Sequence, residues 1–267
     1  MVDEFDQDKR SRDLIKSLEK GIAVLRAFSE RSGTLTMSEI AEQLDLSRPG
    51  VRRILLTLEH LGYTYQHRGV WGLTPRVLEL GAGYFSEISL PEIANPYLQI
   101  LTDAVGETCH VAVWDRDEVV HVARAEVRRI LQDSVRVGTR LPAYATALGQ
   151  VLLTGLSSAD LAEFLHKTDR VALTPHTLVD ESALKARIEE VRGSGCAIAI
   201  EELESGMTGA AVPILANGEL IGALGATSTM LRSSRASLAE QIVPRLREAA
   251  AQIARSYELS HRQHSTA

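Results

Sequence analysis

The stretch that decides the fold is Thr36-Met37-Ser38-Glu39-Ile40-Ala41-Glu42-Gln43-Leu44-Asp45-Leu46-Ser47-Arg48-Pro49-Gly50-Val51-Arg52-Arg53-Ile54-Leu55. Thr36 and Glu39 have the spacing of a capping box, in which each side chain binds the other's free backbone N–H group. Ser47 is a good N-cap for a second helix, whose apolar stripe continues to Leu61. Two short helices joined by a tight turn are typical of a helix-turn-helix.

The second helix of this pair buries its apolar stripe, so its polar residues project from the other faces. In a helix-turn-helix this element is the recognition helix, and its N-terminal end enters the major groove of DNA. An arginine there binds a guanine edge or holds a phosphate. Three arginines on one helix are equally compatible with a solvated face. The candidate DNA-binding residues of the two helices are Ser38, Ser47, Arg48, Gly50, Arg52, Arg53 and Thr57.

A β-hairpin is predicted directly after the recognition helix. Tyr63–Tyr65 and Val70–Leu73 are β-prone runs on either side of Gln66-His67-Arg68-Gly69. A hairpin in this position is the wing of a winged helix, and its tip would offer His67 and Arg68 to the DNA. The alternative is a plain hairpin that closes a small core.

Length and composition set the outer limits. The chain has 267 residues, of which 45% are hydrophobic and 24% charged, and this length favours two domains. No stretch approaches the ~18 apolar residues that span a bilayer, so no membrane partner is expected. The two cysteines form no C-x-x-C motif, which suits a reducing cytoplasm.

The net charge of −6 is unevenly distributed. Residues 1–85 contain 12 Lys and Arg against 12 Asp and Glu, so the whole acidic excess lies after residue 85. The segment Leu46–Leu58 holds three arginines and no acidic residue. A local basic cluster of this kind can face a phosphate backbone even when the whole chain is acidic.

The patterns predict an α+β protein with an N-terminal winged helix-turn-helix domain, a helical linker and a C-terminal αβ domain. The predicted parts are an acidic tail (1–12), the winged helix-turn-helix (13–74), a linker helix (75–93), the C-terminal domain (94–258) and a C-terminal tail (259–267). In the C-terminal domain, strands are expected at 110–114, 119–123, 129–135, 196–200, 210–215 and 220–227. Helices are expected there at 143–153, 158–165 and 182–193. A last helix follows from Leu238, and Pro244 should kink it or mark its true start.

Motifs for catalysis are poor. There is no Walker loop and no Rossmann glycine pattern, and Ser182-Ala183-Leu184-Lys185 stands without the other motifs of its enzyme class. Cys109 and His110 are neighbours on a strand, so they point to opposite faces. His110 and His121 would meet across a hairpin and bind a metal, but no carboxylate has a supporting spacing. No catalytic residue, metal or cofactor is therefore predicted.

One segment favours a ligand. Leu141–Gly149 runs from a loop into a helix through small residues, and the free N–H groups of a helix start suit a carboxylate. The turn Gly206–Ala211 is similarly small. Tight packing of helix on sheet explains both segments equally well. The candidate ligand-binding residues are Arg140, Tyr144, Ala145, Thr146, Ala147, Leu148, Met207, Gly209, Ala211, Ala226 and Thr227. Arg140 or Arg136 would add a counter-charge, although an arginine here could equally brace the loop.

Several ordered motifs resemble those of IclR-type transcriptional regulators along nearly the full chain. They are Ser17–Leu25, Ser38–Ala41, Arg53–Leu58, Leu61–Tyr63, Val137–Gly149 and Glu201–Glu204 with Gly206. The resemblance implies a winged-helix DNA-binding domain, a GAF-like αβ effector-binding domain, and dimers that pair into tetramers on an operator. Leu73–Gly81 and Ser89–Ala94 look most like the regulators of protocatechuate, 4-hydroxybenzoate and β-ketoadipate catabolism. Some relatives carry a polar or sulfur side chain at the position of Gly209, so the glycine here suggests a roomier pocket.

This resemblance implies a cytoplasmic regulator that binds a palindromic operator in double-stranded DNA and senses a small organic acid. The acid would be aromatic or oxo-dicarboxylic, and the chain would be a homodimer or a dimer of dimers. One alternative is an enzyme that acts on a small organic acid and carries an appended DNA-binding domain. Another is a structural DNA-binding protein with no ligand.

Overall fold

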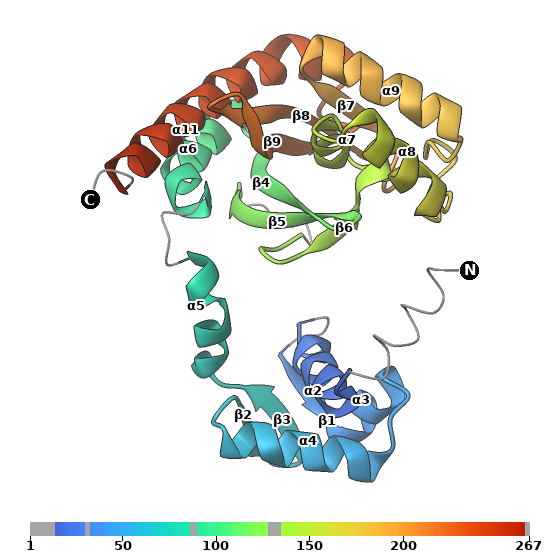
Figure 1. Ribbon diagram of the computed structural model, residues 1–267, viewed down its shortest axis with the longest axis vertical. Helices are drawn as coiled ribbons and strands as arrows, with labels where there is room; N and C mark the ends of the chain where they lie inside the picture. Colours follow the sequence, from blue (N-terminus) through green and yellow to red (C-terminus); the bar gives the residue numbers. More distant parts are fainter. Residues whose placement is uncertain (1–13, 30–32, 86–89, 128–134, 265–267) are drawn as a thin grey trace. The chain divides into compact units, whose positions relative to one another are not determined.

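The computed structural model describes residues 14–29, 33–85, 90–127 and 135–264. The chain forms two compact units, Met1–Ser86 and Glu87–Ala267 (Figure 1). The sequence predicted a linker helix at 75–93. The last residues of that range instead begin α6 (Leu90–Val105), a helix of the second unit. Among the described helices, none is both long and apolar enough to cross a membrane.

The first unit combines helices with a small antiparallel sheet in the order β1-β3-β2. Its elements are α2 (Lys16–Ala27), β1 (Thr34–Thr36), α3 (Met37–Gln43), α4 (Arg48–His60), β2 (Thr64–His67), β3 (Val70–Leu73), the 3-10 turn η1 (Pro75–Leu78) and α5 (Glu79–Phe85). The buried centre contains Val24 of α2, Ile40 of α3, Leu55 of α4 and Trp71 of β3. The helices and the wing therefore share one core, and the predicted winged helix-turn-helix is confirmed.

Local hydrogen bonds explain where the two helices of the motif begin. The Thr36 Oγ1 accepts a hydrogen bond from the Glu39 N–H at 3.2 Å, and the Glu39 carboxylate accepts one from the Thr36 N–H at 2.7 Å. At the start of α4, the Ser47 Oγ accepts from the Gly50 N–H at 3.3 Å. Both caps satisfy N–H groups that a helix start leaves without partners.

The wing is a tight hairpin in which His67 pairs with Val70. Arg68 and Gly69 lie between them with φ angles of 48° and 86°. Two consecutive positive φ angles are those of a type I′ turn, whose twist matches that of the flanking strands. Glycine adopts this conformation without steric cost, so Gly69 is the residue that makes the short turn possible.

The second unit is built on a six-stranded antiparallel sheet in the order β6-β5-β4-β9-β8-β7. Its strands are β4 (Thr108–Asp115), β5 (Glu118–Ala125), β6 (Arg140–Pro142), β7 (Ala197–Ile200), β8 (Met207–Ala216) and β9 (Glu219–Thr229). The strand predicted at 129–135 falls almost wholly outside the described residues. β6, which the sequence did not predict, pairs with β5 at the sheet edge.

Helices cover both faces of this sheet (Figure 1). α6 and α11 (Val243–His264) pack side by side on one face. The other face is covered by α7, α8 and α9. The elements of that layer are the 3-10 turn η2 (Ala143–Ala145), α7 (Ala147–Leu153), α8 (Ser158–Lys167) and α9 (Glu181–Ser194). The second unit therefore has two apolar layers with the sheet between them.

Three prolines mark the helices of this unit. α6 includes Pro91, which falls in the predicted linker, and Pro96 in its interior. α11 follows the short helix α10 (Arg235–Ser237) and the π-helical turn η3 (Leu238–Ile242) without a break. Pro244 therefore lies inside a continuous helical run, directly after a π turn, and the alternative in which it marks the helix start is wrong. A departure from the α-helical hydrogen-bond pattern is a usual accompaniment of an interior proline.

Candidate functional site

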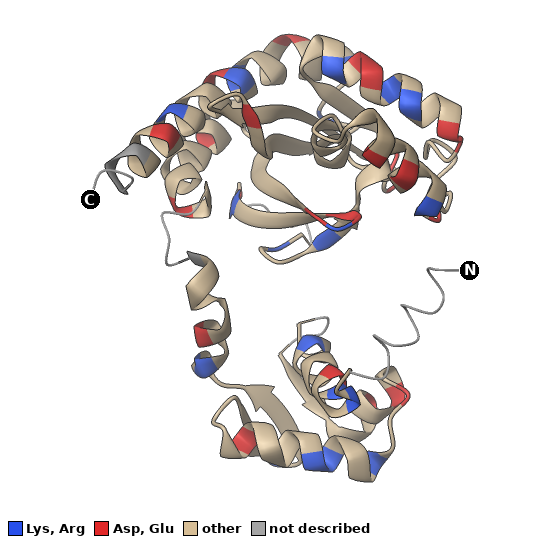
Figure 2. Ribbon diagram, in the orientation of Figure 1, with Lys and Arg blue, Asp and Glu red and all other residues tan. Residues whose placement is uncertain are grey.

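The arginines of α4 form the basic part of the first unit. Arg48, Arg52 and Arg53 are exposed, while Val51 and Leu55 between and beyond them are fully buried. Figure 2 shows the basic residues gathered in the N-terminal half of α4, and an acidic residue only near its other end. The predicted recognition helix therefore presents its positive charge at the end that a helix-turn-helix inserts into DNA.

The three arginines do not share one face. Arg48 and Arg52 are one helical turn apart and so lie above one another. Arg53 is rotated by about 100° from Arg52 and borders a groove between α2 and α4, together with Thr57, Leu18 and Ile22. The structure thus separates Arg53 from the other two, a distinction that residue spacing alone did not make.

The remaining candidate DNA-binding residues have identifiable local roles. Ser47 and Gly50 form the N-cap of α4, and the Thr57 hydroxyl donates a hydrogen bond to the Arg53 carbonyl at 2.8 Å. Ser38 is exposed on α3. His67 and Arg68 are exposed at the tip of the wing. Ser38, His67 and Arg68 are therefore accessible to a partner.

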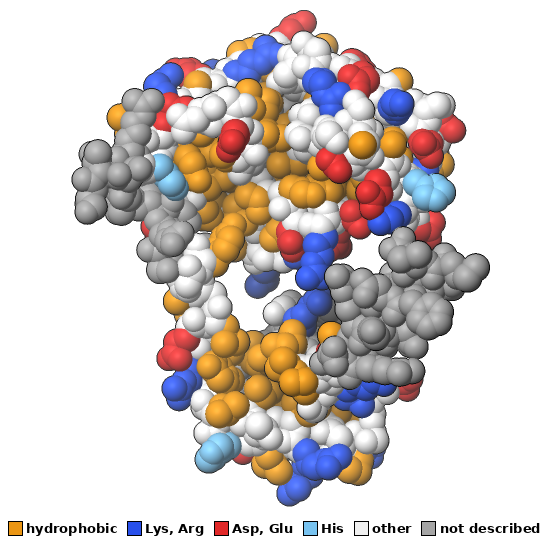
Figure 3. Space-filling view, viewed as in Figure 1, with side chains coloured by type: hydrophobic (Ala, Val, Ile, Leu, Met, Phe, Trp, Pro, Cys, Tyr) orange, Lys and Arg blue, Asp and Glu red, His pale blue; other side chains and the backbone are white. Residues whose placement is uncertain are grey.

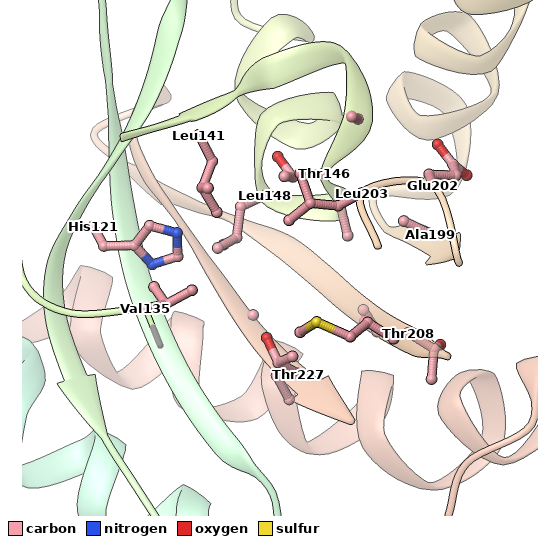
Figure 4. A pocket seen from close by; sticks show the side chains of 17 residues that line it. His121, Val135, Leu141, Thr146, Leu148, Ala199, Glu202, Leu203, Thr208 and Thr227 are labelled. Carbon is pink, nitrogen blue, oxygen red and sulfur yellow. The ribbon is translucent and has the colours of Figure 1, made fainter. Parts of the chain in front are cut away.

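A pocket lies on the face of the six-stranded sheet that α7 covers (Figure 4). Its volume is about 70 Å³. The lining comes from β5, β7, β8 and β9, from the start of α7 and from neighbouring loops. The residues are His121, Val135, Leu141, Ala145, Thr146, Ala147, Leu148, Ala199, Glu202, Leu203, Met207, Thr208, Gly209, Ala210, Gly225, Ala226 and Thr227.

Most of the candidate ligand-binding residues meet in this pocket. They come from three separate segments of the sequence, at the start of α7, on β8 and on β9. These residues are Ala145, Thr146, Ala147, Leu148, Met207, Gly209, Ala226 and Thr227.

Three candidates lie elsewhere. Arg140 binds Asp115 at 2.7 Å and Glu118 at 2.5 Å, because the turn between β4 and β5 brings both carboxylates to its guanidinium group. These two hydrogen bonds raise the pKa of Arg140. The Tyr144 hydroxyl is held by the backbone of Val171, and Ala211 is buried in the core between sheet and α7. Arg136 is exposed and outside the pocket lining, so neither arginine is the expected counter-charge.

Thr146 has a structural role that the sequence did not assign. Its hydroxyl oxygen accepts a hydrogen bond from the Gly149 N–H at 3.0 Å and is thereby the N-cap of α7. Accepting this hydrogen bond leaves the Thr146 hydroxyl its own donor, so a ligand contact by Thr146 stays a prediction. The predicted single helix from 143 to 153 is divided at this residue into η2 and α7.

Two titratable residues in the lining were not candidates. Glu202 is 5% exposed, and its carboxylate binds the Gln150 amide at 2.6 Å and the Arg187 guanidinium at 3.0 Å. Burial raises the pKa of Glu202, and this effect outweighs that of Arg187 and Gln150, which lower the pKa. His121 belongs to β5, far in sequence from the rest of the lining. A run of small residues signals the pocket, but it does not indicate which distant strand completes it.

His110 and His121 lie against one another as the sequence suggested, with ring centroids 5.0 Å apart and the rings at 84°. No group of three or more His, Cys, Asp or Glu side chains suited to a metal ion occurs among the described residues. Cys109 points to the opposite face, where burial raises its pKa to about 12. The Cys109 thiol is therefore a core residue rather than a nucleophile.

A helix-turn-helix unit together with a sheet unit that contains a largely apolar pocket has the two parts of a ligand-responsive DNA-binding protein. The chain belongs to the IclR family of bacterial transcriptional regulators. Residues 17–68 match the model of the IclR helix-turn-helix domain, and residues 82–255 match that of the bacterial transcriptional regulator IclR C-terminal domain.

Similar proteins agree with this assignment. The chain is 37% identical to the Pca regulon regulatory protein of Pseudomonas putida, over 93% of this chain and 84% of that protein. It is 36% identical to the p-hydroxybenzoate hydroxylase transcriptional activator of Acinetobacter baylyi, over 91% and 92% respectively. An IclR homolog of Microbacterium hydrocarbonoxydans, solved in complex with 4-hydroxybenzoate, superposes with a TM-score of 0.79 at 26% identity, covering 92% and 99%. These relatives are regulators, and nothing supports the enzyme alternative.

Proposed function

We propose that this regulator binds a two-fold operator through α4 and the wing, and that a small organic acid enters the pocket and changes its affinity for DNA. The observation that carries the proposal is the pocket itself. Its lining combines two segments that the sequence had selected for a ligand, on a fold shared with a relative that was solved with 4-hydroxybenzoate. The acid must bind two arrangements of the protein with different affinities to have any effect on DNA binding.

An acid of aromatic catabolism is the proposed effector, because the similar regulators are named for the pca regulon and for p-hydroxybenzoate hydroxylase. The pocket volume of about 70 Å³ is smaller than a cavity of ~150 Å³ that holds benzene. Met207 lines the pocket and has a flexible, unbranched side chain. We expect Met207 to change rotamer when the acid enters.

A two-fold operator requires two DNA-binding heads, so we propose a homodimer in the cytoplasm, with two dimers on one operator as the larger form. Exposed apolar side chains of the first unit support this assembly. They are Leu14, Ile15, Leu18, Ile22, Leu78, Leu80 and Tyr84. Figure 3 shows hydrophobic side chains gathered on the surface of the first unit near α2.

Filling the pocket tests the effector site. In the variant Gly209→Leu a branched side chain occupies space at the pocket, and even a Cβ atom there would lie 3.1 Å from the Ala226 carbonyl oxygen. The melting temperature of the full chain is measured with 4-hydroxybenzoate, protocatechuate and β-ketoadipate. We expect one of these acids to raise the melting temperature of the wild-type chain and to have no effect on Gly209→Leu, whose operator binding without acid persists.

Gly193→Leu is the matched control, because a Cβ at Gly193 meets nothing within 4 Å. This variant should respond to the acid as the wild type does. A full response by Gly209→Leu would place the effector elsewhere. No response of the wild-type chain to any of the acids would contradict the proposed effector class, and conversion of an acid to a product would contradict the assignment as a regulator.

A further inference from the structure

His121 is the feature of the pocket that the proposed function leaves unused. It is 3% exposed and lies on β5, and Figure 4 shows its ring pointing from this strand toward the centre of the pocket. Val135, Leu141 and Leu148 surround it there. An imidazole ring is therefore placed among apolar side chains at one end of the pocket.

The strand itself turns His121 toward the pocket. The pairing of β5 with β4 shifts at one point, where Ala112 faces His121 but Val111 faces Ala123. Val119 packs with α7, and His121, two residues further along the strand, faces the same layer. The bulge follows His121, and beyond it Val122 and Ala123 pack with α6 and α11.

From these observations, and on the proposed function above, we infer that His121 binds the carboxylate of an aromatic monocarboxylic acid through an imidazole N–H. A hydrogen bond between an imidazole N–H and a carboxylate is charge-assisted, and it is strong where apolar walls exclude water. The same walls, formed by Leu141, Leu148, Leu203 and Met207, suit the apolar ring of such an acid.

The inference differs from a site at the start of α7. The Thr146 hydroxyl and the Gly149 N–H at that helix start already bind one another at 3.0 Å. The carboxylate of Glu202 binds Gln150 and Arg187, which are outside the pocket lining. Among the described lining residues, His121 is the one with an imidazole ring, and this ring faces the centre of the pocket.

A ligand pair that differs only at the carboxylate separates a direct contact from a structural role. The full chain is titrated by calorimetry with 4-hydroxybenzoate and with its neutral isostere 4-hydroxybenzamide. The variants are His121→Phe, which removes the donor, and His121→Gln, which retains an uncharged N–H donor. His110→Gln is the matched control, because His110 is a buried histidine of the neighbouring strand that is outside the pocket lining.

We expect His121→Phe to bind the acid about 10- to 100-fold more weakly while affinity for the amide changes little, since a hydrogen bond to a charged group is being removed. His121→Gln should lie between the wild type and His121→Phe, and His110→Gln should keep the wild-type preference for the acid over the amide. Melting temperatures without ligand check that each variant is folded.

Several outcomes would overturn the inference. Equal losses for acid and amide in the His121 variants would show that His121 only supports the fold of the pocket. An unchanged preference for the acid would place the carboxylate on another residue, and tighter binding of adipate than of 4-hydroxybenzoate would exclude an aromatic monocarboxylate. These results leave the proposed pocket standing, whereas wild-type protein that binds neither acid would remove the proposed effector as well.

Discussion

Gly149 lies directly against the backbone of Ala143, in the segment where small residues predicted a ligand site. A Cβ atom at this position would be 2.2 Å from the Ala143 carbonyl oxygen. The sequence left two explanations open for these small residues, a ligand site and tight packing. Features of both occur within a few residues. Gly149 serves close packing of α7 on η2, while Ala145 to Leu148 line the pocket.

Substitution of Gly149 by alanine is expected to destabilise the second unit by about 1–3 kcal/mol, as for other overpacked positions, because a backbone cannot move aside like a side chain. Gly193 in α9 is the matched control, since its Cβ would meet nothing within 4 Å. Gly193→Ala should be neutral or stabilise by up to ~1 kcal/mol through helix propensity. Chemical denaturation of the full chain measures both values. Equal stability of the two variants would contradict the close contact.

Single residues show where prediction from sequence ends. Ala145, Thr146, Met207 and Gly209 were found because small residues and helix starts are visible in short stretches of chain. For Arg140 the sequence left a counter-charge and a bracing role open, and the ion pairs with Asp115 and Glu118 favour the bracing role. The sequence could not decide between them, because these partners precede Arg140 by more than twenty residues and reach it only through strand pairing. Contacts that depend on the register of strands leave no local trace in the sequence.

Whole elements were easier to predict where they carry their own start signals. The Thr36–Glu39 capping box and the Ser47 cap give α3 and α4 nearly the predicted bounds. α6 has start signals too, since Ser89 and Glu92 have the spacing of a capping box and Pro91 lies in the first turn. It also contains Pro96 in its interior, where proline costs ~3 kcal/mol in an isolated helix. Burial of Leu98 and Leu101 against the sheet and α11 offsets that cost, so packing rather than propensity forms α6.

At the level of α4, replacing Arg48, Arg52 or Arg53 with alanine is expected to weaken binding to an operator found by in vitro selection. An arginine that reads a base should cost ~1–3 kcal/mol and relax one operator position. An arginine that holds a phosphate should weaken binding to all sequences and flatten the salt dependence. Titrations at several salt concentrations distinguish these roles for each variant.

Arg255→Ala is the control for this series, because Arg255 is exposed on α11 of the second unit. It should leave operator affinity and its salt dependence unchanged. If all three α4 variants bound the operator as tightly as the wild type at low salt, α4 would not be the recognition helix.

For the whole molecule, the prediction concerns assembly. Leu18 and Ile22 on α2 are 60% and 48% exposed, although both are apolar. The double variant Leu18→Glu, Ile22→Glu is expected to sediment as a monomer, because two buried carboxylates would oppose association of two such surfaces. It should also lose most of its operator affinity, since each half-site is then bound independently.

Ile100→Glu provides a matched substitution in the second unit, where Ile100 of α6 is 68% exposed. We expect it to keep the sedimentation coefficient of the wild type. A double variant on α2 that remained dimeric would move the principal contact between copies away from α2, and unchanged operator binding by a monomer would contradict recognition of two half-sites.

The fixed start of α7 has a consequence for the use of this protein as a biosensor. One wall of the pocket is held by the Gly149–Ala143 backbone contact and by the Thr146 cap, so most substitutions there would destabilise the sensor. The opposite wall presents Met207 and Gly209 from β8. A mutant library for new inducers should therefore randomise positions 207 and 209 and leave 143–149 intact, which keeps most library members folded in a reporter strain.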